Sequence, residues 1–295
     1  RQERAEQAMA DTRREDPAAA AQLRAADPRA ALTARYLHDY APAPLYGGTA
    51  VRYYPDGQTM LADMLPALQS AERSIFVESF IIGMGEMWGQ IHEILRRKAA
   101  AGLDVRVIYD DAGCLSLLPH NYAELLRAEG IRAFSFNRCV PVLNLVMNNR
   151  DHRKIMVIDG RIGFTGGVNL ADEYINRLVR FGYWKDSTVR LTGDGAWGFA
   201  VQFMQMWKML GRHFPNEDDY YRSRREGPAV EGFCQPFEDG PLNNPDNPVE
   251  AVYLQLIASA KRMLYITTPY YAVEESMHRG GRRGGCAADD PRHPG

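Results

Sequence analysis

From about Thr49 onward, short apolar runs alternate with segments of helical periodicity, and no other feature of the sequence constrains the fold as strongly. The helical segments read TMLADMLPALQSA, MWGQIHEILRRKAAAG and NYAELLRAEG, and the apolar runs read SIFVESFII, DVRVIYDD and IRAFSFN. Strands that alternate with helices form a largely parallel sheet covered on both faces. We therefore expect an α/β fold with helices on both sides of a mainly parallel, mixed sheet. An apolar helix, GAWGFAVQFMQMWKML, closes this unit, and we expect its Met and Trp residues in the core.

The stretch RDHRKIMVIDGRIGFTGGVN, residues 150–169, predicts a β-hairpin. Asp159 and Gly160 lie between two apolar runs rich in β-branched residues, and Asp-Gly in that position favours a type I′ turn. Such a turn needs positive φ at both central residues, which Asp tolerates and Gly adopts freely. The sequence therefore predicts a two-residue loop joining two antiparallel strands.

The register of this hairpin brings two polar side chains to one face. With a two-residue loop, Lys154 lies opposite Thr165 and His152 lies opposite Gly167. Side chains alternate along a strand, so His152 and Lys154 point to the same side of the sheet. An imidazole and an ammonium group are therefore expected next to each other.

The return strand adds further features to the same place. Gly166 and Gly167 allow a close approach to the backbone, and Asn169 can turn its amide toward His152 and Lys154. Imidazole can attack phosphorus or move a proton near neutral pH, while the ammonium and amide groups can hold phosphoryl oxygens. This set suits a phosphate ester and requires no metal or other cofactor. A lone His-x-Lys would more simply be a solvated surface hairpin, so the prediction depends on the complete pattern.

The pattern resembles the HKD signature of the phospholipase D superfamily, with His152, Lys154, Asp159 and Asn169 at the spacing of that motif. Further stretches are similar to bacterial cardiolipin synthases, and the resemblance covers roughly residues 36–275. These stretches are VRYYPDGQTM, SIFVESFIIGMGEMW, VRVIYDDAGCL, NNRDHRKIMVIDGRIGFTGGVNLADEYINR and FGYWKDSTVRLTGDGAWGFAVQFMQMW. The resemblance implies a phospholipase D-like α/β/α sandwich lobe.

The resemblance also implies roles for the motif residues. His152, Lys154 and Asp159 form the catalytic motif, and Lys154, Asn169, Gly166 and Gly167 bind the substrate. The position of Asp159 in the turn argues for a different role, because Asp in such turns bonds to its own backbone. We therefore assign no proton transfer to Asp159.

Three further acids are candidates for the same site. Glu78 is a single carboxylate in an apolar strand, and burying it is costly unless it meets a cation or an imidazole. It could orient the ring of His152, or it could lie at a strand edge in water. Asp110 and Asp111 end the next strand, where sites of α/β proteins gather, but a helix cap is an equal alternative.

The implied reaction is a phosphatidyl transfer from one phosphatidylglycerol to another with release of glycerol, through a phosphohistidine. Two motif histidines act in it, and His152 is either the nucleophile or the acid/base. The implied place is the cytoplasmic face of a bacterial membrane, with anionic lipid as the partner. Two alternatives stay open. One is another phosphodiesterase of the superfamily, a phospholipase or a nuclease; the other is an inactive single-lobe fragment.

Composition limits these alternatives. The net charge of −2 provides no global field for nucleic acid, and a nuclease should have a basic groove with stacking aromatics, so we expect no nucleic-acid partner. The four cysteines lack CxxC spacing and are expected as reduced thiols. No run of about 18 apolar residues is present, so the sequence predicts no spanning helix.

An internal repeat sets the expected domain organisation. LPALQSAERSIFVESF, residues 65–80, aligns with LQLIASAKRMLYITTP, residues 254–269, at an offset of 189. The same offset from His152 falls at position 341, beyond the 295 residues, so we expect the second HKD lobe to be missing. The tail after Ser276 lacks apolar periodicity, as a frameshifted or partial gene would produce.

The expected parts therefore follow one another in a simple order. Residues 1–45 form a helical connector with breaks before the prolines at 17 and 28, and residues 46–222 form the first lobe. Residues 223–250 are a linker rich in Pro, Gly and Asn, and residues 251–295 begin a truncated second lobe with an aberrant tail.

Overall fold

The computed structural model describes residues 14, 16–138, 150–180, 182–214, 217–222, 232–239 and 247–267. The chain forms two compact units. The larger unit comprises Arg1–Ala19 and Pro44–Pro236, and the smaller comprises Ala20–Ala43 and Phe237–Gly295. The candidate site residues named above all belong to the larger unit.

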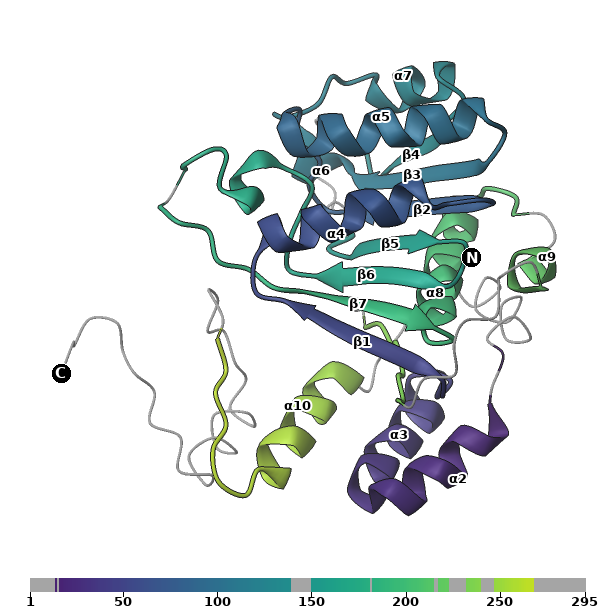
Figure 1. Ribbon diagram of the computed structural model, residues 1–295, viewed down its shortest axis with the longest axis vertical. Coiled ribbons are helices and arrows are strands. Elements are labelled where there is room, and N and C mark those ends of the chain that lie inside the picture. The colour runs from purple at the N-terminus through teal and green to yellow at the C-terminus, as the bar shows by residue number, and fades with distance from the viewer. Residues whose placement is uncertain are drawn as a thin grey trace. The chain divides into compact units, whose positions relative to one another are not determined.

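A seven-stranded sheet in the order β1-β7-β6-β5-β2-β3-β4 forms the centre of the larger unit (Figure 1). The strands are β1 (Thr49–Tyr54), β2 (Ser74–Ser79), β3 (Asp104–Asp110), β4 (Arg132–Phe136), β5 (Lys154–Ile158), β6 (Ile162–Gly166) and β7 (Thr188–Gly193). β2, β3 and β4 run parallel, while β2–β5, β5–β6, β6–β7 and β7–β1 pair antiparallel. The α/β fold with a mixed sheet is as expected, but only two of the six strand pairs are parallel, which is fewer than the sequence suggested. The tight turn between β5 and β6 forces an antiparallel pair, whereas parallel strands need long crossovers.

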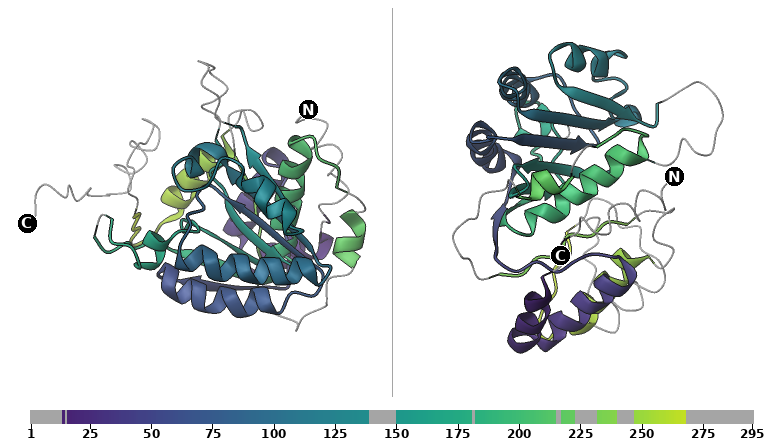
Figure 2. Two further views of the ribbon diagram at one scale, coloured as in Figure 1. Left: turned by 90° about the horizontal axis from the view of Figure 1, so that it is seen from above. Right: turned by 90° about the vertical axis from the view of Figure 1, so that its right-hand side faces the viewer.

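Helices cover both faces of this sheet (Figure 2). α4 (Gly57–Gln69), α5 (Glu86–Ala100) and α7 (Tyr122–Ala128) pack on one face, and α8 (Ala196–Met209) packs on the other. Shorter helices are α6 (Asp111–Cys114), η2 (Asp172–Ile175) and α9 (Glu217–Arg222). The larger unit is therefore a three-layer α/β/α structure, as the sequence predicted.

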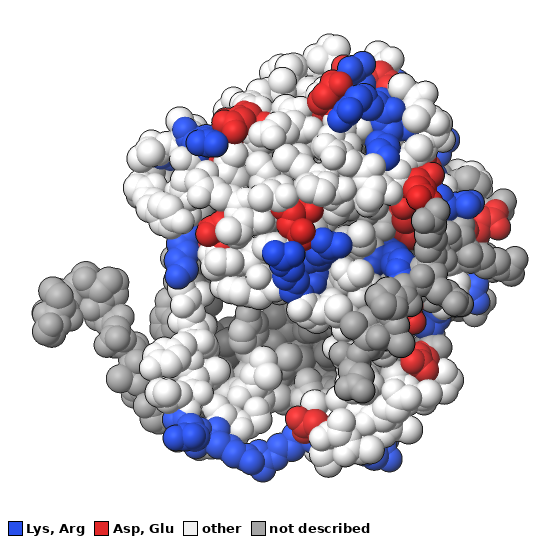
Figure 3. Space-filling model, viewed as in Figure 1, with Lys and Arg blue, Asp and Glu red and all other residues white. Residues whose placement is uncertain are grey.

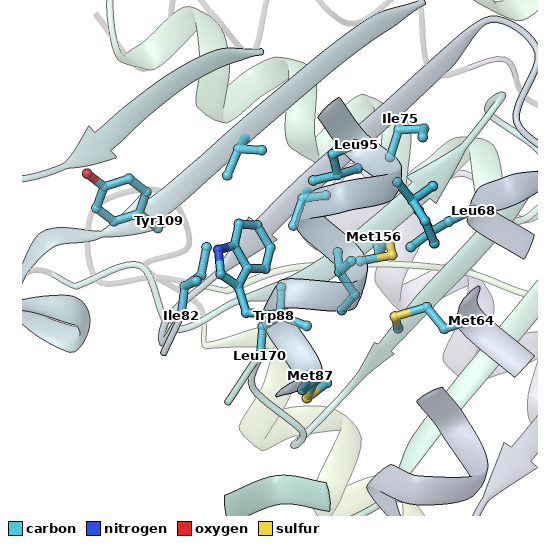
Figure 4. Close-up of a cluster of buried hydrophobic side chains, with 14 of the residues drawn as sticks. Met64, Leu68, Ile75, Ile82, Met87, Trp88, Leu95, Tyr109, Met156 and Leu170 are labelled. Carbon is cyan, nitrogen blue, oxygen red and sulfur yellow. The ribbon is translucent and has the colours of Figure 1, made fainter. Parts of the chain in front are cut away.

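Strand β2 shows how the two cores arise. Its six residues are all buried, and alternation sends Ile75 and Val77 toward α4 and α5 but Phe76 toward α8. On the first face Trp88 of α5 lies among apolar side chains from several elements (Figure 4). On the second face Trp197, in α8, is buried. Trp207, Met204 and Met206 of the same helix are buried as well. The prediction that these side chains form core is confirmed.

The β5–β6 hairpin has the predicted turn but a different register. Asp159 and Gly160 have φ of 51° and 63°, and the N–H of Arg161 donates to the carbonyl of Ile158 at 3.0 Å. The ladder then pairs Ile158 with Ile162, so Arg161 is an extra residue that forms a bulge. Pairing across the hairpin is shifted by one residue, and Ile155, rather than Lys154, lies opposite Thr165. The predicted register is therefore wrong by one.

In the smaller unit α3 (Pro28–Tyr40) contacts α10 (Pro248–Ser259). Helix α2 (Pro17–Ala26) ends before the proline that begins α3, so the predicted break before Pro28 is confirmed. The internal repeat aligns residues 263–268 with β2, which predicts a second strand there, but the described part of this stretch, 263–267, forms no strand, and Tyr265 is among its exposed residues. An isolated strand segment is not stable without neighbours, which accounts for the difference.

Part of the predicted linker packs on the larger unit. The backbone N–H groups of Tyr46 and Cys234 donate to each other's carbonyl oxygens at 2.8 and 2.9 Å. Burial raises the pKa of the Cys234 thiol to about 11 and that of the Cys114 thiol to about 12, and both cysteines are free. Neither of these two described cysteines forms a disulfide. The other stretches of the linker, 223–231 and 240–246, lie outside the described residues.

Candidate active site

His152 and Lys154 lie where β5 begins. This is the end of the sheet at which the neighbouring strands β2 and β3 finish. The centroid of the His152 ring is 4.6 Å from that of Phe80, and the Lys154 Nζ atom is 5.4 Å from the same centroid. Lys154 Nζ also donates to the carbonyl oxygen of His152 at 2.7 Å. The structure therefore brings the predicted imidazole and ammonium groups together on one aromatic ring.

The surroundings lower the pKa values of both groups. Desolvation, and then the charge of Lys154, lower the pKa of His152 below its usual value, so its imidazole is neutral at pH 7. Desolvation lowers the pKa of Lys154 to about 8, although the charges of Asp151 and Asp186 oppose the shift. At neutral pH the site thus contains a neutral imidazole, able to attack or accept a proton, and a charged ammonium.

Asp110 fixes the segment that carries His152. Its Oδ2 atom accepts the backbone N–H of Asp151 at 2.9 Å, and its Oδ1 atom accepts the N–H groups of Ala112 and Gly113 at 2.9 and 3.0 Å. Burial raises the pKa of Asp110, against the effect of these hydrogen bonds. Asp110 is therefore the cap of α6, which is the second of its two alternatives, and it also fixes the backbone next to His152; it is 0% exposed and does not line the site. Asp111, the other candidate at the end of this strand, is the first residue of α6.

Glu78 pairs with Arg153, and it lies on the other side of the sheet from Lys154. The Arg153 Nε atom is 3.1 Å from Glu78 Oε1 and 3.1 Å from Asp151 Oδ1, and Glu78 is only 1% exposed. The predicted meeting with a cation is confirmed. The possible role in orienting His152 has no support in the geometry, because alternation along β2 and β5 turns Glu78 and Arg153 away from the face of Lys154.

Gly166 and Gly167 permit a close approach, but the partner is the chain itself. A Cβ atom on Gly166 would lie 2.3 Å from the carbonyl oxygen of Ser187, and one on Gly167 would lie 2.0 Å from the carboxylate of Asp186. Asp186 Oδ1 also accepts the N–H of Ser187 at 2.8 Å. The glycines thus let Asp186 approach the site closely enough to affect the pKa of Lys154.

Asp186 is a residue that the sequence analysis missed. It follows Asn169 by a long and irregular connection, and only the pairing of β6 with β7 brings it back beside Gly167. The signal available in the sequence was the glycine pair itself, which requires a neighbour at close range. That neighbour could not be identified without knowing the strand order.

Asn169 lies inside the fold instead of turning toward the substrate position. It is 3% exposed; its Oδ1 atom accepts the N–H of Ile81 at 3.0 Å, and its Nδ2 atom donates to Tyr174 Oη at 2.7 Å. The amide therefore ties the segment after β2 to η2. Because Phe80 precedes Ile81, Asn169 supports the aromatic ring that lies beneath His152, and its predicted contact with phosphoryl oxygens is not the arrangement present.

Asp159 lies at the opposite end of β5 from Lys154. Its carboxylate accepts the backbone N–H groups of Glu72, Arg73 and Ser74, each at 2.9 Å. The side chain therefore fixes the turn, as its position suggested, but through the start of β2 and not through its own backbone. The structure does not bring it to His152 and Lys154, so the catalytic place implied by the motif is not supported.

A small, half-open pocket lies between the sheet and α4, and Lys154 is among its lining residues. Its lining is mostly apolar and includes Met60, Met64 and Phe164, with the polar side chain of Thr188. The site thus combines a cation with an adjoining apolar space. Among the described residues, no three His, Cys, Asp or Glu side chains are grouped so that they could hold a metal ion.

The basic side chains do not form a continuous track on the face drawn in Figure 3. Lys and Arg of the described residues gather there in small separate groups, several of them next to Asp or Glu. No helix in the described part of the chain is long and apolar enough to cross a membrane.

Comparisons with known proteins agree with this fold and motif. Residues 64–179 match a family model described as "Cardiolipin synthase, PLD-like domain". A cardiolipin synthase of Staphylococcus aureus strain Mu50 is 32% identical over 229 residues, which are 77% of this chain and 46% of that protein. A protein of Streptococcus mutans named only as uncharacterized is 41% identical over 244 residues, 83% of this chain and 52% of that one.

Among solved structures, phosphatidylserine synthase of Haemophilus influenzae has the same fold. Its TM-score is 0.56 at 15% identity, over 85% of this chain and 63% of that one. Fold and motif together define a phospholipase D-like domain. The chain belongs to the phospholipase D superfamily. It spans about half the length of the curated relatives it matches.

Proposed function

We propose that this chain supplies one HKD motif of a phosphatidyltransferase of the cardiolipin synthase type. Such an enzyme joins two phosphatidylglycerol molecules into cardiolipin and releases glycerol. The observation that carries the proposal is the position of the His152 imidazole and the Lys154 ammonium group next to each other on the ring of Phe80. Two observations support a lipid as the substrate. The amino-acid sequence is 32% identical to that of a cardiolipin synthase, and the pocket at Lys154 has a mostly apolar lining.

The transfer needs two imidazoles. In the first step a neutral imidazole nitrogen attacks the phosphorus of one phosphatidylglycerol, and the bond from phosphorus to the glycerol oxygen breaks as a second imidazolium gives that oxygen its proton. In the second step the second imidazole takes the proton of the incoming hydroxyl. That oxygen then displaces the first imidazole from phosphorus. His152 performs one of these roles, and a second HKD motif, in the same polypeptide or in another copy, performs the other.

Lys154 acts directly on the phosphate, and two further residues hold the backbone of the site in position. The ammonium of Lys154 holds the non-bridging oxygens, on which negative charge grows as phosphorus becomes five-coordinate. Asp110 and Asn169 act as positioning residues, since they fix the backbone of Asp151 and of Ile81 on either side of the site.

A phospholipase is the second candidate, and one observation favours it. His152 is partly covered by Phe80 but keeps part of its surface in solvent, so water could compete with a lipid hydroxyl for the phosphohistidine. The two functions give different products from phosphatidylglycerol, namely cardiolipin with glycerol or phosphatidic acid with glycerol. A product analysis therefore distinguishes them.

The test is the replacement His152→Ala in the complete enzyme, with His213→Ala as a matched exposed histidine elsewhere on the unit. We expect His152→Ala to lose cardiolipin formation from phosphatidylglycerol vesicles by a factor of at least about 10³, because neither attack nor proton transfer has a substitute. His213→Ala should retain the activity. Cardiolipin formation by His152→Ala at the parental rate would contradict the proposal.

A further inference from the structure

The connection between η2 and β7 exposes several large apolar side chains. In the described residues 177–180 and 182–185, here together called the basic-apolar loop, the exposed fractions of Leu178, Val179 and Tyr183 are 54%, 76% and 70%. The loop projects beyond the end of the sheet in the view of Figure 1. Grouped exposed apolar side chains on a protein surface mark a place that meets another phase or molecule.

Basic side chains alternate with these apolar ones. The side chains of Arg177 and Arg180 are 59% and 58% exposed, and Lys185 is exposed as well. Arg177 lies 3.2 Å from Glu86 and Arg180 lies 3.9 Å from Glu173, but exposed pairs of this kind contribute little. Their guanidinium groups can therefore exchange a carboxylate for a phosphate at small cost.

The base of the basic-apolar loop is fixed by Asn176. Its Nδ2 atom donates to the carbonyl of Trp184 at 3.0 Å, and its Oδ1 atom accepts the N–H of Trp184 at 2.6 Å. The ring of Trp184 lies 4.8 Å from that of Tyr174. The two ends of the loop are thus clamped together, and the exposed side chains are presented from a defined base.

The loop lies at the same edge of the sheet as the candidate active site. Asp186 follows it directly, lies against Gly167 and affects the pKa of Lys154. On its other side, the pair of Arg177 with Glu86 links it to the segment of Met84, which is also exposed. A surface that contacts this loop therefore also comes close to Lys154 and its neighbour His152.

We propose that the basic-apolar loop docks the larger unit on a bilayer of anionic phospholipid. Leu178, Val179 and Tyr183 enter the interfacial layer, and the basic side chains contact lipid phosphates. The alternation of arginines with apolar side chains favours this partner, since a bilayer interface offers phosphates and hydrocarbon side by side. The inference rests on the proposed function, because it brings the phosphodiesters of the bilayer to the level of His152.

The first test measures binding of the 295-residue chain to vesicles by flotation, without turnover. The vesicles are an equal mixture of phosphatidylglycerol and phosphatidylcholine, or phosphatidylcholine alone. Leu178→Ser with Val179→Ser should weaken binding to the mixed vesicles about tenfold, because two aliphatic side chains no longer leave water. The control is Val51→Ser with Tyr53→Ser on β1, at exposed fractions of 58% and 61%, which should change binding less than about twofold.

The second test separates charge from apolar contact. Arg177→Gln with Arg180→Gln should weaken binding to the mixed vesicles on the order of tenfold and leave binding to phosphatidylcholine unchanged. Unaltered binding by both double variants, or no binding by the parent chain, would overturn the inference. It would also be overturned if the loop variants changed the mass in solution instead, since the loop would then join two copies. A chain that binds as expected while the complete enzyme makes no cardiolipin contradicts only the proposed function.

Discussion

At the scale of single residues, Lys154 and His152 differ from ordinary side chains because burial disfavours their charged forms. Lys154 has a pKa of about 8, and the pKa of His152 is also lowered. Phe80 contributes to this burial, since its ring lies against both. The proposed transfer needs a neutral imidazole and a charged ammonium at the same pH. The two lowered pKa values therefore define a pH range in which both groups have the required charge, and the upper limit of this range is near pH 8.

The rate of transfer should accordingly fall as the pH rises through about 8. Above that pH Lys154 loses the proton that makes it a cation, whereas an ordinary lysine keeps it to about pH 10. In Lys154→Arg the charge persists, so any remaining activity should lack this alkaline loss. The measurement is kcat/KM of the complete enzyme against pH, and an alkaline limb near pH 8 that is unchanged in Lys154→Arg would contradict the assignment.

The pair of Glu78 with Arg153 should matter for stability. Arg153→Met leaves Glu78 charged and buried, which should reduce the free energy of unfolding by about 3–5 kcal/mol. Adding Glu78→Gln removes the buried charge, so the double variant should regain much of the loss. Urea unfolding of the parent chain and these two variants measures this, and a loss below about 1 kcal/mol for Arg153→Met would show that the pair is unimportant.

At the scale of elements, the β5–β6 hairpin is joined to the start of β2 by Asp159. Asp159→Ala removes the acceptor of three N–H groups and should lower the free energy of unfolding by about 2–4 kcal/mol. Asp159→Asn should lose less, because it keeps one acceptor and tolerates the positive φ. The measurement is again urea unfolding. Abolished transfer with unchanged stability in Asp159→Ala would instead restore a catalytic role.

The same hairpin shows what local sequence can and cannot predict. Asp159 and Gly160 determine the turn, because few residues adopt positive φ. The bulge at Arg161 depends on contacts from outside the hairpin, since its carbonyl accepts the N–H of Gly193 near the end of β7 at 2.9 Å. A register derived from the turn alone therefore differed by one residue. Helices such as α5 were predictable because their apolar periodicity and the glycine at their end are local signals.

At the scale of the whole molecule, the strand order accounts for the remaining differences. The three layers could be predicted because strands and helices alternate in the sequence. The motif could be predicted from the spacing of its residues. Asp186 and the pairing of Glu78 with Arg153 depend on which strands lie next to each other, and no local pattern specifies that. The position of Asn169 likewise follows from the meeting of β2 with η2. The polar groups that support the site were therefore harder to predict than His152 and Lys154.

The central claim is that this chain provides one half of a site that works with two histidines. Its sequence contains a single HKD motif, and the described site provides one imidazole beside Lys154. The most direct measurement separates the purified 295-residue chain by size, determines the mass of each fraction, and assays each with phosphatidylglycerol vesicles. We predict that the monomer forms no cardiolipin, whereas robust cardiolipin formation by the monomer would contradict the claim.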